Sequence, residues 1–162
     1  MEARDFIARY AGVYEHSPWV AERVAAIAAD DADTERLAAL MADCVDNAST
    51  ELQLELIRAH PDLAGRAQVA GELTADSALE QASAGLDQCT PEEFERFQSL
   101  NAAYREKFGF PFVMAVRGSD RAEILDTFAA RLQNDYDLEF ETALVEIHKI
   151  ARLRLDAMGA NE

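Results

Sequence analysis

The chain is poor in cysteine and has no long apolar run. Its two cysteines, Cys44 and Cys89, are more typical of free thiols in a reducing compartment than of a disulfide framework. No apolar run approaches the roughly 20 residues that a membrane-spanning helix needs. The first residues, Met1 to Asp5, lack the basic flank and the apolar stretch of a signal peptide. We therefore expect a cytoplasmic protein without a membrane partner.

Basic residues are also scarce. Fifteen lysines and arginines stand against 31 acidic residues, which gives a net charge of −16. Such a field repels a phosphate backbone, so we expect no nucleic-acid partner. An anionic substrate has to be held by local arginines or backbone N–H groups that overcome this field. The candidate arginines, each of which can equally be a solvated surface residue, are Arg66, Arg117, Arg152 and Arg154.

Glycine and proline, seven and four in number, leave long stretches free for helices. At 162 residues the chain can bury a core without a metal or disulfide, which predicts a single domain over residues 1–162. Apolar residues recur at helical spacing between short polar turns. The sequence therefore predicts an all-α fold, a compact domain of about six to eight helices.

Capping residues mark where these helices begin. Ser17 with Pro18 predicts a helix to about Asp30, and serine and threonine are strong N-caps. Gly109 and Gly159 are expected to end the two longest helices. Further predicted helix starts are Asp33, Ser49, Thr90 with Pro91 and Glu93, Asp120 and Asp137.

One stretch, at about 109–117, does not fit a helix. Its aromatic and β-branched residues, with a proline among them, predict a buried extended segment. A lone strand has no partner in a helical fold, so its buried N–H and C=O groups must be satisfied in another way. A bound polar ligand would satisfy them, and ordered water would serve as well.

A histidine and a carboxylate lie twenty residues apart in the middle of the chain. His60 ends a predicted helix, because Pro61 disfavours the α conformation before it and has no N–H for the ladder. Ser77, Glu80 and Gln81 lie on one face of the next helix, at i, i+3 and i+4 spacing. If the chain folds back, an imidazole faces a row of polar groups, which is a candidate acid–base site.

Each of these residues also has an ordinary structural explanation. A histidine at a helix C-terminus often caps the helix, and Glu80 with Gln81 can be a solvated face. The other histidines, His16 and His148, are expected to be structural. The three histidines are separated by 44 and 88 residues, which matches no metal-ligand spacing, so we expect no metal.

Five segments of the chain occur together and in an order that matches a known family: 15–22, 60–65, 73–81, 108–117 and 150–155. In these segments the chain resembles the 2-oxo-4-hydroxy-4-carboxy-5-ureidoimidazoline (OHCU) decarboxylases, which catalyse the last step of the route from urate to (S)-allantoin. The resemblance extends from about Arg9 to Leu155. It is specific because the segments occur together, whereas a lone His-Pro-Asp would mean little.

This resemblance implies an all-α homodimer that uses no cofactor and acts on OHCU in purine catabolism. Its proton donor would be His60, and Glu80 would orient or destabilise the substrate. The substrate-binding residues that the resemblance implies are Pro61, Ser77, Ala78, Leu79, Glu80, Gln81, Phe112, Val113, Met114, Ala115, Val116 and Arg154.

The residues fit such chemistry without the family name. Loss of CO2 leaves an electron pair that a neighbouring carbonyl can accept, so the protein must stabilise an oxyanion and deliver a proton. His60 suits the acid role because imidazole titrates near neutrality and a helix C-terminus favours its charged form. The amides of Phe112–Val116 are candidates for the oxyanion side. The residues alone leave open a ureide or cyclic-amide hydrolase and a non-catalytic binding module for a purine catabolite.

Overall fold

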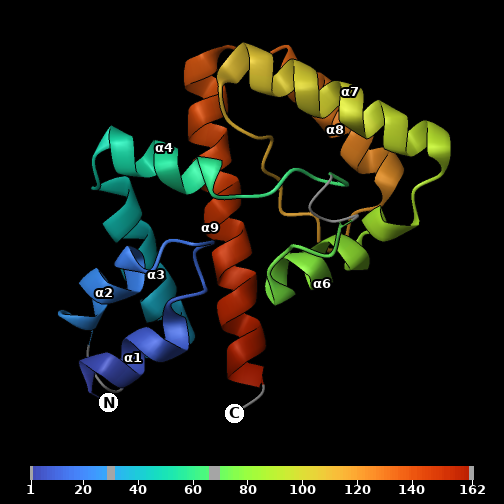
Figure 1. Ribbon diagram of the computed structural model, residues 1–162. Coiled ribbons are helices and arrows are strands. Elements are labelled where there is room, and N and C mark those ends of the chain that lie inside the picture. The colour runs from blue at the N-terminus through green and yellow to red at the C-terminus, as the bar shows by residue number, and fades with distance from the viewer. Residues whose placement is uncertain (1, 29–31, 66–69, 161–162) are drawn as a thin grey trace. The chain divides into compact units, whose positions relative to one another are not determined.

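The protein is all-α in a computed structural model that describes residues 2–28, 32–65 and 70–160 (Figure 1). These residues contain eight α-helices, one short 3₁₀ helix and no strand, which confirms the predicted fold class. None of the described helices is long and apolar enough to cross a membrane. The helices are α1 (Ala3–Tyr10), α2 (Trp19–Ala25), α3 (Thr34–Asp46), α4 (Thr50–Arg58), α6 (Ala75–Ser83), η1 (Leu86–Gln88), α7 (Pro91–Phe108), α8 (Arg121–Leu132) and α9 (Tyr136–Ala160).

The chain divides into two compact units. The first unit consists of Met1–His60 and Ile147–Glu162, and the second consists of Pro61–Glu146. Helix α9 contributes residues to both. The single domain over residues 1–162 stays a prediction.

In the first unit, α2 contacts both α1 and α3. Two of the predicted caps are confirmed here: Asp33 accepts from the Arg36 N–H at 2.8 Å, and Ser49 accepts from the Leu52 N–H at 3.2 Å. These caps satisfy amides that have no partner within their own helix. The core is mostly aliphatic and includes Val20, Val24, Met41, Val45, Leu56, Ile57 and Ile147.

The second unit has an aromatic core beneath the contact between α7 and α8. Tyr104 lies at its centre and makes ring contacts with Phe108, Phe110, Phe112 and Phe128. Helix α7 begins with the predicted capping box, in which Thr90 and Glu93 bond each other's backbone N–H. It ends as predicted at Gly109, whose φ of 76° favours glycine.

The predicted non-helical segment is confirmed in the second unit. Residues 111–116 form neither helix nor strand, and most of them are buried. The Phe112 ring stacks on the Phe128 ring of α8, with centroids 3.9 Å apart and an interplanar angle of 8°. Aromatic stacking therefore anchors a segment that has no ladder of backbone hydrogen bonds of its own.

Some predicted helix ends are wrong. Ser17 does not cap α2, because its Oγ donates to the Glu15 carbonyl and Pro18 takes the N-cap position. Helix α2 ends at Ala25, and the predicted end near Asp30 lies outside the described residues. The last helix starts at Tyr136, because Asp135 rather than Asp137 accepts from the Leu138 N–H, and it continues past Gly159.

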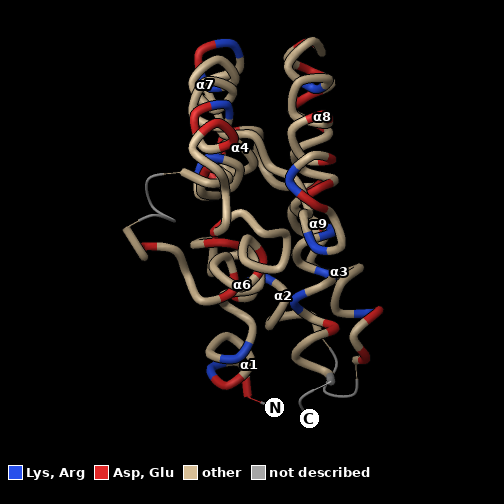
Figure 2. Tube along the Cα trace, turned by 90° about the vertical axis from the view of Figure 1, so that its right-hand side faces the viewer, with Lys and Arg blue, Asp and Glu red and all other residues tan. Residues whose placement is uncertain are grey.

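Acidic residues are spread along helices of both units (Figure 2). The two cysteines are free and half-buried, in agreement with the sequence. The strong negative charge is therefore a property of the helical surfaces as a whole.

Candidate active site

His60 lies just beyond the end of α4, as predicted from Pro61. Its backbone N–H donates to the Ile57 carbonyl at 3.2 Å, and its ring Nδ1 is 2.9 Å from the Leu56 carbonyl oxygen. Only 5% of the residue is exposed. Since a carbonyl can only accept, Nδ1 carries the hydrogen, and Nε2 of the neutral ring is left with a lone pair. The histidine thus caps its helix and also presents a proton-accepting atom.

Burial controls the protonation of His60. It lowers the pKa of His60 to about 4, although the Leu56 carbonyl and the Glu15 carboxylate raise it. The charges of Arg154 and His16 lower it further. The helix end favours the imidazolium as expected, through the Leu56 carbonyl, but its contribution is smaller than the cost of burying a charge.

A buried ion pair in the first unit, between Glu15 and Arg154, acts electrostatically on His60. Glu15 and Arg154 are 2% and 6% exposed, and Arg154 Nη2 is 3.1 Å from Glu15 Oε2. Arg154 Nη1 also donates to the carbonyls of Gly12 and Val13, at 3.1 and 3.3 Å. Arg154 is therefore a buried, oriented cation rather than a solvated surface residue.

The other candidate arginines behave differently. Arg117 and Arg152 are exposed, and Arg152 pairs with Asp156 one helical turn away. Arg66 lies outside the described residues. Sequence reasoning did not assign a role to Glu15. The available signal was its position in the segment 15–22, which carries part of the family resemblance.

In the second unit, the predicted polar face of α6 is confirmed. Ser77 and Gln81 are buried, and Glu80 is half-buried. Ala78 and Leu79 point to the other side and are exposed, Leu79 by 71%. The helix therefore separates the five predicted substrate-binding positions into an inner polar face and an outer face.

Gln81 fastens α6 to the loop of the His-Pro-Asp motif. Its Oε1 accepts from the Ala64 N–H at 3.0 Å, and its Nε2 donates to the Asp62 carbonyl at 3.1 Å. Both ends of the amide are thus used by backbone groups. Gln81 can therefore shape the site by holding this loop.

Two further amide side chains, both on α7, hold the same loop. Gln98 donates to the Ala64 carbonyl at 2.7 Å, and Asn101 donates to the Leu63 carbonyl at 3.0 Å. Ala64 has a φ of 49°, an uncommon value for a residue with a Cβ. These bonds stabilise an otherwise unfavourable turn. They could not be predicted from the sequence, because the partners lie 34 and 38 residues apart.

Side chains, rather than a ligand or water, satisfy part of the 111–116 segment. Arg131 Nη1 donates to the Val113 carbonyl at 2.6 Å, and Glu146 Oε1 accepts from the Ala115 N–H at 3.2 Å. The Arg131 guanidinium also lies 4.4 Å from the centroid of the Phe112 ring. The predicted use of these amides as oxyanion donors stays a prediction, and the Ala115 N–H already has an acceptor.

Arg131 belongs to a second buried ion pair. Its Nε donates to Glu139 Oε1 at 2.8 Å, and Tyr104 Oη donates to the same oxygen at 2.6 Å. Asn134 Nδ2 donates to Glu139 Oε2 at 3.0 Å. Burial and the Glu139 hydrogen bond raise the pKa of Tyr104 far above its ordinary value. The tyrosine thus remains a hydrogen-bond donor at neutral pH.

Two cavities lie among the described residues, one in each unit. The cavity in the second unit has a volume of about 650 Å³. Its lining includes Pro61, a predicted substrate-binding residue, together with Asp62, Asn101 and Arg105. Asp62 and Arg105 form an ion pair at 2.9 Å. This cavity therefore borders the His-Pro-Asp loop.

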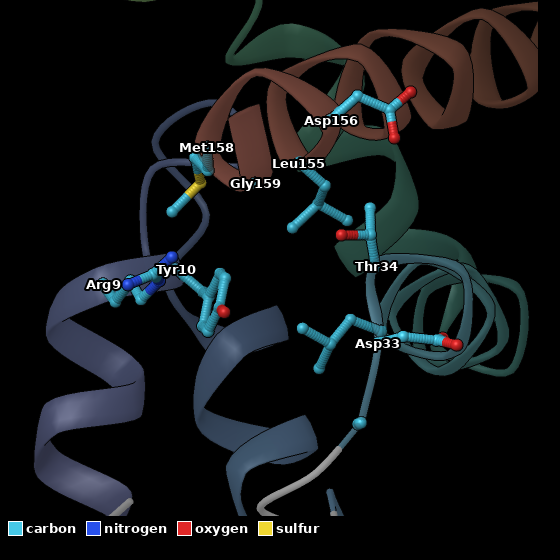
Figure 3. A pocket seen from close by; sticks show the side chains of 10 residues that line it. Arg9, Tyr10, Asp33, Thr34, Leu155, Asp156, Met158 and Gly159 are labelled. Atoms are coloured by element: carbon cyan, nitrogen blue, oxygen red, sulfur yellow. The ribbon is translucent and has the colours of Figure 1, made fainter. Parts of the chain in front are cut away.

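The cavity in the first unit is about 460 Å³ and lies among α1, the start of α3 and the end of α9 (Figure 3). Arg9 and Tyr10 line one side, and Asp33, Thr34 and Asp156 line another. No residue predicted for the site lines it. It offers no argument for catalysis.

The candidate residues are shared between the two units. His60 and Arg154 belong to the first unit. So does Glu15, whose charge acts on His60 and which was not among the predicted residues. Pro61, residues 77–81 and residues 112–116 belong to the second. Within the first unit, a buried neutral histidine near a buried ion pair is an arrangement that is often found where acid–base chemistry takes place.

The chain belongs to the OHCU decarboxylase family, whose sequence model matches residues 1–156. An OHCU decarboxylase of Haloferax volcanii is 46% identical over 157 residues, which is 97% of this chain and 90% of that protein. An OHCU decarboxylase of Halalkalicoccus jeotgali is 44% identical and covers 94% of this chain and 84% of its own length. The resemblance found in the sequence is confirmed.

A crystal structure of (S)-allantoin synthase has the same fold. It is 35% identical in sequence and superposes with a TM-score of 0.78 over 97% of this chain. The match covers 50% of the other chain, so the present chain spans half of that protein's length. The shared part is therefore the all-α region described above.

Proposed function

We propose that this chain is a carboxy-lyase that decarboxylates OHCU to (S)-allantoin in urate degradation. The observation that carries this proposal is the match to the Haloferax volcanii OHCU decarboxylase along nearly the whole of both chains. The buried acid–base group His60 and the oriented cation Arg154 support it.

The reaction breaks the C–C bond to the substrate carboxylate and releases CO2. The electron pair stays on the ring, where neighbouring unsaturated groups delocalise it, and the product gains one proton in place of CO2. The protein must therefore place a proton donor on one face and stabilise negative charge nearby. A positioned general acid typically contributes about 10² to 10⁴ in rate.

We assign the proton donor to His60. It is neutral in the free protein at pH 7, because burial lowers its pKa to about 4. An anionic substrate bound nearby raises that pKa, since a negative charge favours the imidazolium. On this proposal, His60 takes up a proton when the substrate carboxylate arrives and returns it to the ring carbon after CO2 has left.

We assign Glu80 to orienting the substrate or to destabilising its carboxylate. Its half-buried position on the inner face of α6 supports a role toward a ligand. The remaining substrate contacts are assigned to Pro61, Ser77–Gln81, Phe112–Val116 and Arg154. Within this set, Gln81 acts at least in part through the loop that it holds.

We also propose a homodimer, on the strength of the family resemblance, and a cytoplasmic location. Light scattering during gel filtration tests the first point. A mass near twice the 17.9 kDa of one chain supports a dimer, and a mass near 17.9 kDa contradicts it.

Identification of the product tests the proposed reaction. OHCU generated in situ from urate should give CO2 and allantoin in equal amounts, and should do so faster with the protein than without it. Ring opening without CO2 would indicate a hydrolase, and binding without turnover would indicate a non-catalytic module. Either result would contradict the proposed function.

A further inference from the structure

Glu15 has no assigned role in the proposed reaction, yet it is one of the most deeply buried charged groups of the described chain. Its partner Arg154 is almost as buried, and the pair is 3.1 Å apart. Burying such a pair gains little stability, because an apolar pair of similar size is often as stable or more so. Its presence beside a candidate catalytic histidine therefore calls for a functional reason.

The geometry shows how Glu15 acts on Arg154. Two backbone carbonyls, of Gly12 and Val13, accept from one end of the guanidinium, and the Glu15 carboxylate accepts from the other. The Ser17 hydroxyl bonds the Glu15 carbonyl at 2.9 Å and so fixes the turn that carries the carboxylate. A planar guanidinium held at two sites has one orientation.

The same pair sets the charge around His60. The groups that act on its ring are the Leu56 carbonyl at the end of α4, Glu15 and His16 in the turn before α2, and Arg154 on α9. Glu15 and the Leu56 carbonyl favour the protonated ring, whereas Arg154 and His16 disfavour it. Without Glu15, the Arg154 charge would act on His60 uncompensated.

We propose that Glu15 is a positioning residue of the active site, whose carboxylate orients the Arg154 guanidinium and offsets its charge so that His60 can take up a proton. This inference rests on the proposed function, in which His60 and Arg154 serve the reaction. Glu15 acts through these two residues and needs no contact with the substrate.

The first test is a histidine NMR titration, which needs no substrate. The chain has three histidines, and a His60→Asn variant identifies the His60 signal. Glu15→Gln should move the His60 titration to lower pH, and Arg154→Gln should move it to higher pH. Shifts in the same direction, or no shift in either variant, would overturn the inference.

Further variants separate charge from folding and position. Glu15→Asp keeps the charge, so His60 should titrate as in the wild type while Arg154 loses part of its support. The double variant Glu15→Gln/Arg154→Gln removes both charges of the pair. It therefore still allows a test if a single variant, left with one buried charge, does not fold. Its His60 should titrate between the two single variants, and a titration outside that interval would overturn the electrostatic part.

The second test is the pH dependence of turnover. Glu15→Gln should reduce kcat/KM about 10- to 100-fold and move the midpoint of the pH–kcat profile to lower pH, with partial rescue by Glu15→Asp. A loss of activity with an unmoved midpoint and no rescue would mean a purely structural role and would contradict the inference. If the wild type itself does not turn over OHCU, the proposed function fails, and the NMR titration still decides the role of Glu15.

Discussion

Two buried carboxylate–guanidinium pairs, one in each unit, have similar geometry and different neighbours. Glu139 in the second unit is fully buried, and Arg131, Tyr104 and Asn134 all donate to it. Glu15 in the first unit accepts a hydrogen bond from Arg154, and its charge acts on His60. Burial lowers the pKa of His60 well below its ordinary value. The first arrangement connects residues of the aromatic core, and we propose that the second sets the protonation of His60.

Both pairs are buried, so their neighbours, rather than burial, distinguish the structural pair from the one to which we assign a function. In the second unit Arg131, Tyr104 and Asn134 all act as hydrogen-bond donors to Glu139. In the first unit the neighbour is an imidazole with a lone pair on Nε2. A change in charge at Glu15 should therefore alter the protonation of His60, whereas a change in charge at Glu139 should alter the stability of the fold.

The largest expected effect comes from removing the titrating group itself. His60→Asn should reduce turnover by about 10² to 10⁴, because the general acid is lost. Helical content at pH 7 should be nearly unchanged. The measurement is steady-state kinetics with circular dichroism of the protein as the folding check. His148→Asn is the matched control and should keep its activity; full activity in His60→Asn would remove His60 from the mechanism.

Breaking the structural pair should affect stability. Glu139→Leu leaves Arg131 buried without its anion, which typically costs about 3 to 5 kcal/mol. Urea unfolding at pH 7 measures this loss. A loss below about 1 kcal/mol, the size of a surface ion pair, would mean that the two pairs do not differ as described.

Glu80 is a third carboxylate and belongs to neither pair. We expect Glu80→Ala to reduce kcat/KM about 100-fold, in the range of a general acid–base contribution, with little change in stability. Glu80→Gln tells its two possible roles apart. An equal loss in both variants indicates that charge is needed, and a smaller loss in Glu80→Gln indicates a hydrogen bond. Wild-type kinetics in both would remove Glu80 from the site.

The lowered pKa of His60 predicts a pH-dependent stability. Between pH 6.5 and about 4 the unfolded chain binds a proton that folded His60 does not, so stability is full above 6.5 and falls as the pH drops. From pH 7 to pH 5 the loss due to His60 is about 2 kcal/mol. Urea unfolding of the wild type and His60→Asn at both pH values measures it, and equal losses in the two proteins would contradict it.

The smallest expected effect comes from a substitution that leaves both ion pairs intact. Thr90→Ala removes the capping box of α7, the helix that carries Tyr104, and should cost about 1 kcal/mol of stability. Turnover at 25 °C should remain at the wild-type level. A large loss of activity would mean that the cap of α7 also holds the site in place, in addition to stabilising the helix.

Local signals made much of the fold predictable. The capping box at Thr90 and Glu93, the stop at Gly109 and the helix end before Pro61 depend on residues close in sequence, and all were predicted. Ser17 failed because its hydroxyl has a nearer acceptor, the Glu15 carbonyl. Local capping rules do not include such competition.

The long-range parts of the site could not be predicted from sequence. The Arg154–Glu15 bond joins residues 139 positions apart, and the amide bonds of Gln98 and Asn101 to the loop span 34 and 38. For the same reason the lowered pKa of His60 could not be predicted from the sequence. Its helix end is visible in the sequence, but its burial depends on packing from other elements.

The most direct test of the central claim is the rate of formation of optically active allantoin. OHCU is generated in situ from urate, and circular dichroism follows the product with and without the protein, beside the His60→Asn variant. The account predicts that the wild type accelerates the signal and that His60→Asn does not. A rate with the wild-type protein equal to the spontaneous rate would contradict the decarboxylase assignment.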